Sequence, residues 1–531
     1  MKKFTYLILG LLSSTLYASE RPNIIFLLAD DMRWDSMGHL GIFEVKTPTL
    51  DKLAEKGTRF TRNYNTTAIC MASRAQIMTG LYEFSTGSNF LHGNLAWQKW
   101  EKSYPMLLRK NGYFTGFAGK FGFHLNDETG KPLKGGTTER VIKSFDWWSG
   151  WMGQGSYQMN ENREAHEYKN VYGDKAEHTT YALGLMGRDF VKKAKASGKP
   201  FCLSISFKAP HTPLATDPRY DSLYEGVKFT KPADFNEVDK LPAQAKSGRP
   251  LSKGKGWVRS YDDTMKKYHT MIYGMDKAIA MILEEVKEQQ VEDNTIIIFT
   301  SDNGHHNGSK GLGGKLYAYE VGSLAPAIIY DPRHDTCQKF KTNEALSGNI
   351  DFHPTILDYA GIAKAAPNHG KSMVSLIKGE KQKLHDSLLL INVWGIASAQ
   401  SLGVVTDDYK YINWFYGADD FTPTEELFNL KKDAFEQDSL AMNPEAKPQL
   451  EAMRQLYDKF LAQWKEESVA GAGYEKYVQL ADRTIPFSQH SQEMIASMYS
   501  DDKAGKTKQD KKAKKDKKAK KDKKAADKNK S

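Results

Sequence analysis

Cysteine, long apolar runs and net charge in the main body are all scarce in this sequence. The 531 residues include only three cysteines: Cys70, Cys202 and Cys337. Three cysteines exclude the dense disulfide framework that stabilises many small secreted domains. After the N-terminal segment, no stretch reaches the about 20 apolar residues that a membrane-spanning helix requires. The sequence therefore predicts a chain stabilised by its core, with no transmembrane segment.

The formal charge of +10 lies almost entirely in the C-terminal tail. Residues 501–531 contain 15 Lys and 6 Asp, whereas the preceding 500 residues hold 60 Lys and Arg against 59 Asp and Glu. The body has no net basic charge of the kind that nucleic-acid-binding domains carry, so we expect no nucleic-acid partner. The tail, placed at residues 500–531, contains no large apolar residue and is predicted to be disordered. It would serve either as a solubilising tail or as a weak tether to an anionic polymer.

The N-terminal segment is typical of a secretory signal peptide. Lys2 and Lys3 precede an apolar run at residues 6–12, and small residues follow up to Ala18. We predict that residues 1–18 are removed and that the protein is exported to the periplasm or the extracellular space. The rest of the chain is long enough for a large domain, placed at residues 19–380, and a smaller one at residues 381–499.

Two apolar runs end in carboxylate or amide side chains. These are residues 23–28, followed by Asp30 and Asp31, and residues 295–300, followed by Asp302 and Asn303. Such runs form strands buried on both faces, and ligands bind at the C-terminal ends of parallel strands. Taken alone, adjacent aspartates also suit a helix cap or a solvated loop. Together, the four oxygen-bearing side chains suit a hard cation, and we expect Ca²⁺ rather than Mg²⁺ because its coordination is more variable.

Cys70 begins a segment in which a small residue and then Ser73 and Arg74 open a short predicted helix. Free backbone N–H groups at a helix start and the Arg74 guanidinium both favour negative charge. Taken alone, Cys70 would be an ordinary buried thiol, as most free cysteines are. Three other segments change that interpretation: Lys120 with His124 after a predicted strand, His211 between two prolines, and Lys315 after a glycine-rich loop.

In this combination and order, the segments resemble the type I, formylglycine-dependent sulfatases of the alkaline phosphatase superfamily. The resemblance runs with gaps from about residue 21 to about residue 464. It implies an α/β fold: an alkaline-phosphatase-like sandwich with a central, mostly parallel sheet, plus a small C-terminal α+β subdomain with an antiparallel sheet. Two departures stand out. Three residues, rather than one or two, separate Lys120 from His124, and Leu324 stands where the family usually has an arginine.

The resemblance implies that a maturation enzyme oxidises Cys70 to formylglycine, whose hydrated aldehyde is the nucleophile. Arg74 would stabilise that group. Conversion of Cys70 would leave two cysteines, Cys202 and Cys337, either as free thiols or as a disulfide. The metal ligands would be the four residues at the strand ends: Asp30, Asp31, Asp302 and Asn303.

The resemblance assigns the remaining polar residues to sulfate binding and proton transfer. Lys120 and Lys315 would donate hydrogen bonds to the sulfate oxygens. His211 would protonate the departing sugar oxygen, and His124 would take a proton from the second hydroxyl so that sulfate is expelled.

Two other functions stay open on the sequence. One is hydrolysis of a phosphoester or phosphonate monoester by an enzyme of the same superfamily. His305 and His306 would be the obvious additional ligands for a two-zinc site. The other is non-catalytic binding of a sulfated polymer by a sulfatase-like body with a basic tail.

The expected substrate is a sulfated carbohydrate. Export favours it, as does an aromatic cluster whose faces suit stacking on sugar rings: Trp147, Trp148, Trp151 and Tyr157. A core or lid patch is the other explanation of these aromatics, and on the residues alone it is the preferred one. Residues 230–256, rich in Pro, Lys and Gly, are predicted to form a surface insertion.

Overall fold

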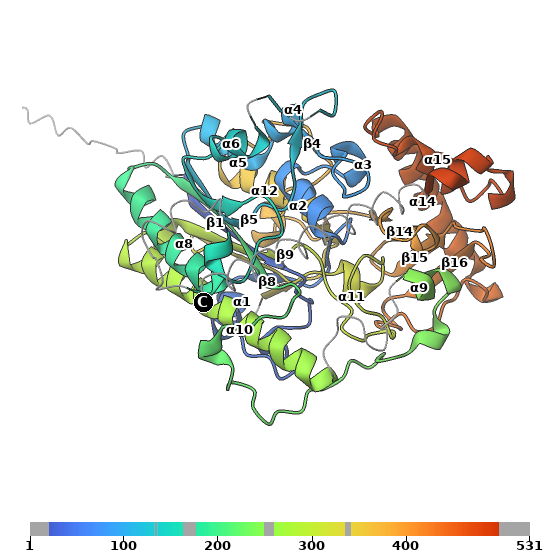
Figure 1. Cartoon of the computed structure of the whole chain (residues 1–531), viewed down its shortest axis with the longest axis horizontal. Coiled ribbons are helices and arrows are strands. Elements are labelled where there is room, and N and C mark those ends of the chain that lie inside the picture. The colour runs from blue at the N-terminus through green and yellow to red at the C-terminus, as the bar shows by residue number, and fades with distance from the viewer. Residues whose placement is uncertain are drawn as a thin grey trace, which may run out of the picture.

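The computed structural model describes residues 21–131, 133–134, 136–162, 177–248, 260–334 and 341–498. The predicted signal peptide, the Lys-rich tail and Cys337 lie outside these described residues. Within them, every helix is too short or too polar to cross a membrane. Figure 1 shows a larger part around a central sheet, and a smaller part that contains the C-terminal, orange to red elements.

An eight-stranded sheet forms the centre of the larger part, in the order β11-β2-β10-β9-β1-β8-β5-β7. Strand β10 runs antiparallel to both its neighbours, and every other neighbouring pair is parallel. This sheet confirms the predicted fold class. The strand bounds are β1 Asn23–Asp30, β2 Thr58–Phe60, β5 Phe114–Lys120, β7 Trp147–Trp151, β8 Phe201–Pro210, β9 Thr295–Ser301, β10 Ala327–Tyr330 and β11 Lys341–Asn343.

Helices and two small strand pairs surround this sheet. The helices are α1 Pro48–Lys56, α2 Cys70–Thr79, α3 Glu83–Thr86, α4 Trp97–Trp100, α5 Tyr104–Lys110, α6 Thr137–Ile142, α8 Thr179–Ala196, α9 Ala243–Gly248, α10 Tyr261–Glu288, α11 Glu320–Ser323, α12 Phe352–Tyr359 and α13 Val374–Ile377. The strand pairs are β3 Asn63–Tyr64 with β12 Ser347–Gly348, and β4 Leu95–Ala96 with β6 Leu125–Asn126.

Strand β1 is buried on both faces because helices cover the sheet on either side. Successive side chains of a strand point to opposite faces. Ile25 and Leu27 therefore pack in one core cluster with residues of α8 and α10. Ile24 and Phe26 pack in another, with residues of α5 and α12. Figure 1 shows these two pairs of helices on opposite sides of the sheet. The continuous apolar run thus supplies both layers and fixes β1 at the centre.

The smaller part is a four-stranded antiparallel sheet covered by helices, as predicted. Its strands follow one another in order. The bounds are β13 Leu388–Asn392, β14 Ser401–Val405, β15 Tyr409–Trp414 and β16 Thr424–Asn429, followed by α14 Lys447–Glu467 and α15 Glu475–Leu480. Its apolar core also contains Tyr317 and Tyr319 from the larger part, so the two parts share one core cluster.

A buried polar contact also joins the two parts. Lys410 on β15 is fully buried and forms ion pairs with Glu320 of α11 at 2.5 Å and with Glu436 at 2.8 Å. The Tyr319 hydroxyl donates to Glu426 of β16 at 2.8 Å. Charged groups in such a position are stable only when each is paired. The contact therefore ties the segment that follows Lys315 to the antiparallel sheet.

The predicted surface insertion at residues 230–256 is wrong for α9. Gln244 and Ala245 are fully buried, and the Gln244 amide donates to the carbonyls of Tyr416 at 3.1 Å and Thr422 at 2.6 Å. A buried glutamine is stable there because it satisfies backbone groups of the smaller part. Polar composition alone therefore gave a misleading signal.

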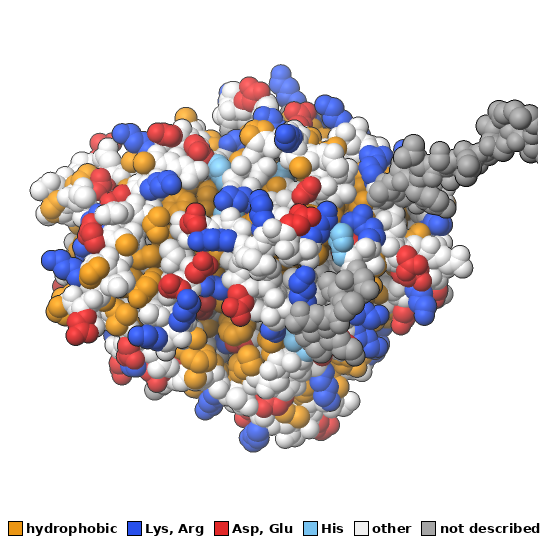
Figure 2. Space-filling model, turned by 180° about the vertical axis from the view of Figure 1, so that it is seen from behind, with side chains coloured by type: hydrophobic (Ala, Val, Ile, Leu, Met, Phe, Trp, Pro, Cys, Tyr) orange, Lys and Arg blue, Asp and Glu red, His pale blue; other side chains and the backbone are white. Residues whose placement is uncertain are grey.

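The aromatic cluster is core rather than a sugar-binding surface. Trp147, Trp148, Trp151 and Tyr157 are each at most 6% exposed. Trp148 stacks on Phe117 with ring centroids 5.1 Å apart. On the outside of the molecule, acidic and basic side chains are interspersed over the face shown in Figure 2, in keeping with a nearly neutral body.

Candidate functional site

The C-terminal ends of four adjacent parallel strands meet at one edge of the central sheet. Strands β1, β9, β5 and β8 deliver, in that order, Asp30 with Asp31, Asp302 with Asn303, Lys120, and His211. Parallel strands end at the same edge, which is where open α/β sheets bind ligands. The topology thus brings together residues that the sequence analysis had selected separately.

Cys70 is the first residue of α2 and is 3% exposed. The residue before it, Ile69, is extended and caps the helix with no side-chain hydrogen bond. The first backbone N–H groups of a helix have no partner within the helix, so they attract an anion. Position 70 is therefore a suitable place for a nucleophile that must approach an anionic group.

Arg74 lies one turn after Cys70, on the same side of α2. Its guanidinium donates to Asp302 Oδ2 at 2.8 Å and to the Lys120 carbonyl at 2.6 Å, and it lies 3.3 Å from Asp30 Oδ2. Burial disfavours the charged form, but Asp302 and Asp30 raise the pKa of Arg74 above its ordinary value. These contacts fix a permanent positive charge beside position 70.

Two lysines neutralise the two aspartates at the end of β1. The Lys120 ammonium lies 2.5 Å from Asp30 Oδ2, and Lys315 forms an ion pair with Asp31. Burial alone would raise the pKa of both carboxyls. Lys120 nevertheless holds the pKa of Asp30 well below its usual range, and Lys315 does the same for Asp31. Both carboxylates are therefore charged at neutral pH.

Asp302 and Asn303 connect β9 to these aspartates. The Asn303 amide donates to Asp31 Oδ1 at 2.6 Å, and Asp302 Oδ1 accepts from the Asp31 backbone N–H at 3.3 Å. Burial and the neighbouring Asp30 raise the pKa of Asp302 to about 6. Two buried oxygens, Asp30 Oδ1 and Asn303 Oδ1, accept no hydrogen bond from the described part of the chain.

These residues fit a divalent cation. Among the described side chains, Asp30, Asp31 and His211 bring potential ligand atoms within 4.8 Å of one another. The buried oxygens of Asp30 and Asn303 that lack a hydrogen-bond donor would suit such an ion, because carboxylate and amide oxygens are preferred ligands of hard cations. Each oxygen of Asp302 already accepts a hydrogen bond, one from the Arg74 guanidinium and the other from the backbone N–H of Asp31.

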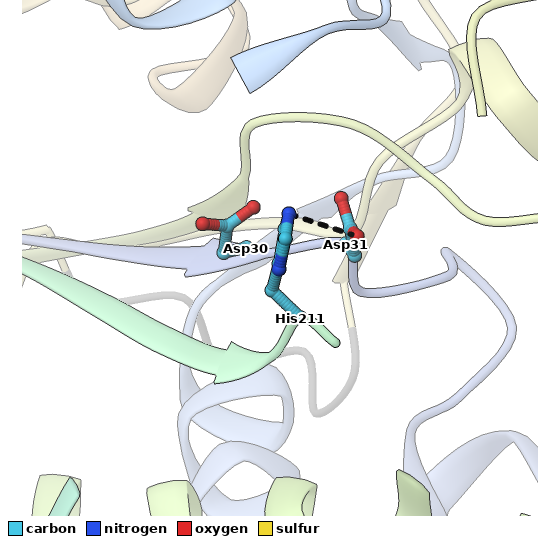
Figure 3. Close-up of side chains that lie close together, drawn as sticks. All are labelled: Asp30, Asp31 and His211. Atoms are coloured by element: carbon cyan, nitrogen blue, oxygen red, sulfur yellow. Dashed lines mark ion pairs between the residues drawn. The ribbon is translucent and has the colours of Figure 1, made fainter. Parts of the chain in front are cut away.

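His211 lies on the loop after β8, and Figure 3 shows its imidazole between the two aspartates of β1. Its Nε2 is 3.8 Å from Asp31 Oδ2, and its Nδ1 is 2.5 Å from the Thr212 carbonyl, to which it donates. Burial lowers the pKa of His211 to about 4, although Asp31 and Asp30 oppose this effect. An anion bound beside the ring would raise the pKa towards the value that a proton donor needs.

His124 occupies a different environment from the other predicted site residues. It is exposed, on the segment that follows β5. Among the described residues, its ring forms no hydrogen bond or ion pair, whereas its carbonyl accepts from Leu95 N at 3.2 Å. Three residues separate it from Lys120, and one of them, Gly122, packs against the Arg74 side chain. The longer spacing therefore leaves His124 outside the buried cluster of charged groups.

Two residues beside Cys70 escaped the sequence analysis. Lys208, within β8, is 4% exposed, and its ammonium donates to the Gln154 carbonyl at 3.2 Å. The Gln154 side-chain amide lies 3.9 Å from Cys70 Sγ. A lysine inside a predicted buried strand is a signal that sequence reasoning can use, because lysine is seldom fully buried without a function or partner. Gln154 lies on an exposed loop and gives no comparable signal.

Substitution of Lys208 should change the pH dependence of turnover. Burial, and then the nearby Lys120, lower the pKa of Lys208 to about 8. The side chain is therefore charged below this pH and loses its charge as the pH rises through it. A bound sulfate prefers the charged form, so we expect kcat/KM of the wild-type protein to fall above about pH 8. Lys208→Arg should move this fall to higher pH, because arginine stays protonated.

The measurement is the pH profile of kcat/KM on a small soluble sulfate ester. Lys208→Met serves as the uncharged control. It should have a lower kcat/KM at neutral pH, and its kcat/KM should not fall further as the pH rises through about 8. The same alkaline decline in all three proteins would show that another group causes it.

Comparison with known families places these features in context. The family described as Sulfatase matches residues 22–362, and the family described as N-sulphoglucosamine sulphohydrolase, C-terminal, matches residues 308–463. The first match covers the whole cluster of charged groups as well as position 70. The second covers all four strands of the antiparallel sheet.

Individual relatives agree with this assignment. The chain is 25% identical over 519 residues to an N-acetylglucosamine-6-O-sulfatase of Bacteroides thetaiotaomicron, covering 84% of this chain and 88% of the relative. It is 29% identical over 400 residues to the N-acetylglucosamine-6-sulfatase of Homo sapiens, covering 71% and 68%.

Solved structures share the fold. An enzyme in complex with its substrate D-glucosamine-2-N,6-O-disulfate has a TM-score of 0.70 and 22% sequence identity, covering 85% of this chain and all of the other. The phosphonate monoester hydrolase of Agrobacterium radiobacter has a TM-score of 0.65 and 18% identity, covering 84% and 96%. The family matches and the fold lead to one conclusion: this chain belongs to the sulfatase family, the sulfuric ester hydrolases of the alkaline phosphatase superfamily.

Proposed function

We propose that this sulfatase removes sulfate from a carbohydrate, with position 70 as the source of the nucleophile. The observation that carries the proposal is the grouping of charges at the strand ends beside the start of α2. Four cationic side chains, from Arg74, Lys120, Lys208 and Lys315, accompany the three carboxylates of Asp30, Asp31 and Asp302. The excess of positive charge favours an anionic group in contact with position 70.

The side chains divide the chemistry between them. Oxidised to formylglycine by a maturation enzyme, position 70 would supply the nucleophilic oxygen that attacks sulfur. Arg74 holds positive charge at that position, and the ammonium groups of Lys120 and Lys315 are available to donate to sulfate oxygens. His211, once an anion raises its pKa, can protonate the departing sugar oxygen. The proton-accepting role of His124 requires the exposed loop after β5 to approach position 70.

The acidic residues would hold the cation. Asp30, Asp31, Asp302 and Asn303 remain our proposed ligands, with His211 as an additional neighbour, and Ca²⁺ is the proposed ion because the available donors are mostly oxygens. Such an ion would polarise a sulfate oxygen and neutralise charge that builds up there.

The carbohydrate assignment rests on relatives. Two of them, from a bacterium and a mammal, are named as N-acetylglucosamine 6-sulfatases. The test is a desulfation screen of sulfated monosaccharides, with N-acetylglucosamine 6-sulfate included, against an aryl phosphate and a phosphonate monoester. Protein that carries Cys70→Ala provides the background. We expect turnover of at least one sulfated sugar, and faster turnover of phosphonate would overturn the proposal.

Phosphonate hydrolysis is the second candidate, because phosphonate monoester hydrolases share this fold with TM-scores of 0.65 and 0.64. A two-zinc phosphatase receives less support. His305 and His306 are buried, but neither belongs to the described triplet of potential metal ligands.

Export and tail binding also remain proposals. We expect active protein to begin after Ala18, which N-terminal sequencing of material from the native host would test. If the Lys-rich tail is a tether, protein that ends at residue 500 should elute from a sulfated polysaccharide at lower salt than the full chain. Equal elution would leave the tail with a solubilising role only.

A further inference from the structure

An exposed aromatic pair lies near position 70. Phe90, on the loop that follows α3, is 43% exposed. Its ring centroid is 5.7 Å from that of Trp394, and the two planes are inclined by 50°. Trp394 follows β13 and is half-buried, and nearby Ile396 is 39% exposed. Large apolar side chains that gather at the surface often mark a binding site.

Trp394 connects this pair to the catalytic position. Ile69, Cys70, Ala72 and Leu316 form a small apolar cluster, and Trp394 packs against it. Leu316 directly follows Lys315 and has a φ of 108°, a left-handed conformation that is costly for a branched side chain. The surrounding contacts therefore hold Leu316 in place between Lys315 and the tryptophan.

A cavity of about 180 Å³ opens beside these residues. The described residues that line it are neutral and include Leu316, Tyr317, Asn392, Trp394, Ile396 and Ala399. The volume is smaller than that of a typical drug-sized pocket, so it suits one part of a monosaccharide rather than an oligosaccharide. Leu316 belongs both to this lining and to the cluster around Cys70, which makes the cavity adjacent to the nucleophile position.

Hydrogen bonds fix the two loops that carry the aromatic pair. The buried Glu83 carboxylate accepts from the Asn89 amide at 2.6 Å and from the Tyr474 hydroxyl at 2.8 Å. His92 Nε2 lies 3.1 Å from the Val393 carbonyl, to which it donates. The first two contacts hold the loop before Phe90, and the last joins His92, after Phe90, to the residue before Trp394. The aromatic pair is thus pre-organised, which lowers the cost of binding.

We infer that Phe90, Trp394 and Ile396 form the site that binds the sugar ring of the substrate, with its sulfate ester directed at position 70. This inference rests on the proposed carbohydrate function. The C–H face of a pyranose is apolar whereas its hydroxyls need water, so half-exposed aromatic side chains suit it well. The described part of the lining is neutral, which favours an uncharged part of the sugar at this position. The sulfate that is cleaved meets the cationic groups instead.

The test compares Phe90→Ala and Trp394→Ala with Phe435→Ala. Phe435 is a matched control because it is 42% exposed and lies after β16, away from this aromatic pair in the chain. The readouts are kcat/KM on the sulfated monosaccharide that the wild-type protein cleaves best, and the inhibition constant of inorganic sulfate. We expect kcat/KM of Phe90→Ala and of Trp394→Ala to fall about tenfold, through a higher KM. A loss of this size corresponds to the binding free energy of one aromatic contact. Inhibition by sulfate and the behaviour of Phe435→Ala should match the wild type.

The outcomes separate this inference from the proposed function. If the wild type cleaves a sulfated sugar and both variants match it, the aromatic site is wrong while the carbohydrate function stands. If the wild type cleaves only aryl sulfates, the carbohydrate function fails and this inference with it. If Trp394→Ala also changes inhibition by sulfate, it has disturbed the packing around Cys70, and Phe90→Ala alone then decides.

Discussion

The Cys70→Ala substitution should lower kcat by a factor on the order of 10⁵ or more, because it removes the thiol at the first position of α2 from which the nucleophile would be made. Position 70 is buried at the helix start with Arg74 one turn away. The neighbouring Lys120 and Lys315 cannot replace it in a covalent step, because an ammonium group paired with Asp30 or Asp31 can donate hydrogen bonds but has no lone pair with which to attack. The measurement is single-turnover hydrolysis of the preferred sulfate ester.

Cys202→Ala is the control for this experiment. Cys202 is also buried, on β8, and burial raises the pKa of its thiol to about 12, so it is an inert thiol. Its substitution should leave turnover within a few-fold of the wild type. In parallel, mass spectrometry of the peptide 63–74 from active protein should find formylglycine at position 70. Active protein with only unmodified cysteine there would contradict the proposed mechanism.

Asp302→Asn should lower metal content and activity together. The substitution keeps the shape of the side chain but removes a charge that faces Arg74 and the other aspartates. We expect metal affinity to fall by at least about tenfold. The measurement is metal content by elemental analysis after dialysis, followed by activity on re-addition of Ca²⁺, Mg²⁺ or Zn²⁺. Ca²⁺ should restore wild-type activity after chelation, and recovery with Zn²⁺ alone would favour a phosphatase-like site.

Asp276→Asn provides a matched control. Asp276 is also buried, burial raises its pKa to about 6, and it accepts hydrogen bonds from the first backbone N–H groups of α1. Its loss should lower stability, as loss of a helix cap does, by about 1 kcal/mol. Metal content should stay at the wild-type level. If both variants lose metal equally, the effect is due to general destabilisation rather than to a ligand at Asp302.

The strand ends were predictable from sequence, and the loops around them were not. Apolar runs before Asp30 and Asp302 indicate parallel strands, and parallel strands end at one edge whatever their order. Phe90, Gln154 and Trp394 come instead from segments between strands, where local pattern contains no information about distant partners. Their approach to position 70 depends on long-range contacts such as Glu83 with Tyr474.

Aromatic residues show the same limit. The clustered tryptophans near residue 150 gave the strongest sequence signal for sugar stacking. They are core instead, because β7 pairs with β5 at the edge of the sheet and its side chains pack in the apolar clusters on both faces. The isolated Phe90 and Trp394, 304 positions apart, gave no signal. Spacing along the chain predicts a shared face only within one helix or strand.

The ion pair of Lys410 with Glu320 makes the stability of the larger part depend on the smaller part, which the sequence alone does not indicate. The sequence places a domain boundary near residue 380, but separation of the two parts there would remove the Lys410 ammonium that pairs with the partly buried Glu320 carboxylate. Loss of one partner from such a pair costs roughly 3–5 kcal/mol, a large share of the stability of an ordinary domain. The segment that carries Lys315 therefore owes its position to a strand nearly one hundred residues later. Because the two parts also share an apolar core cluster, we expect the catalytic part and the antiparallel sheet to unfold together, and exchange of either part alone should destabilise the chain.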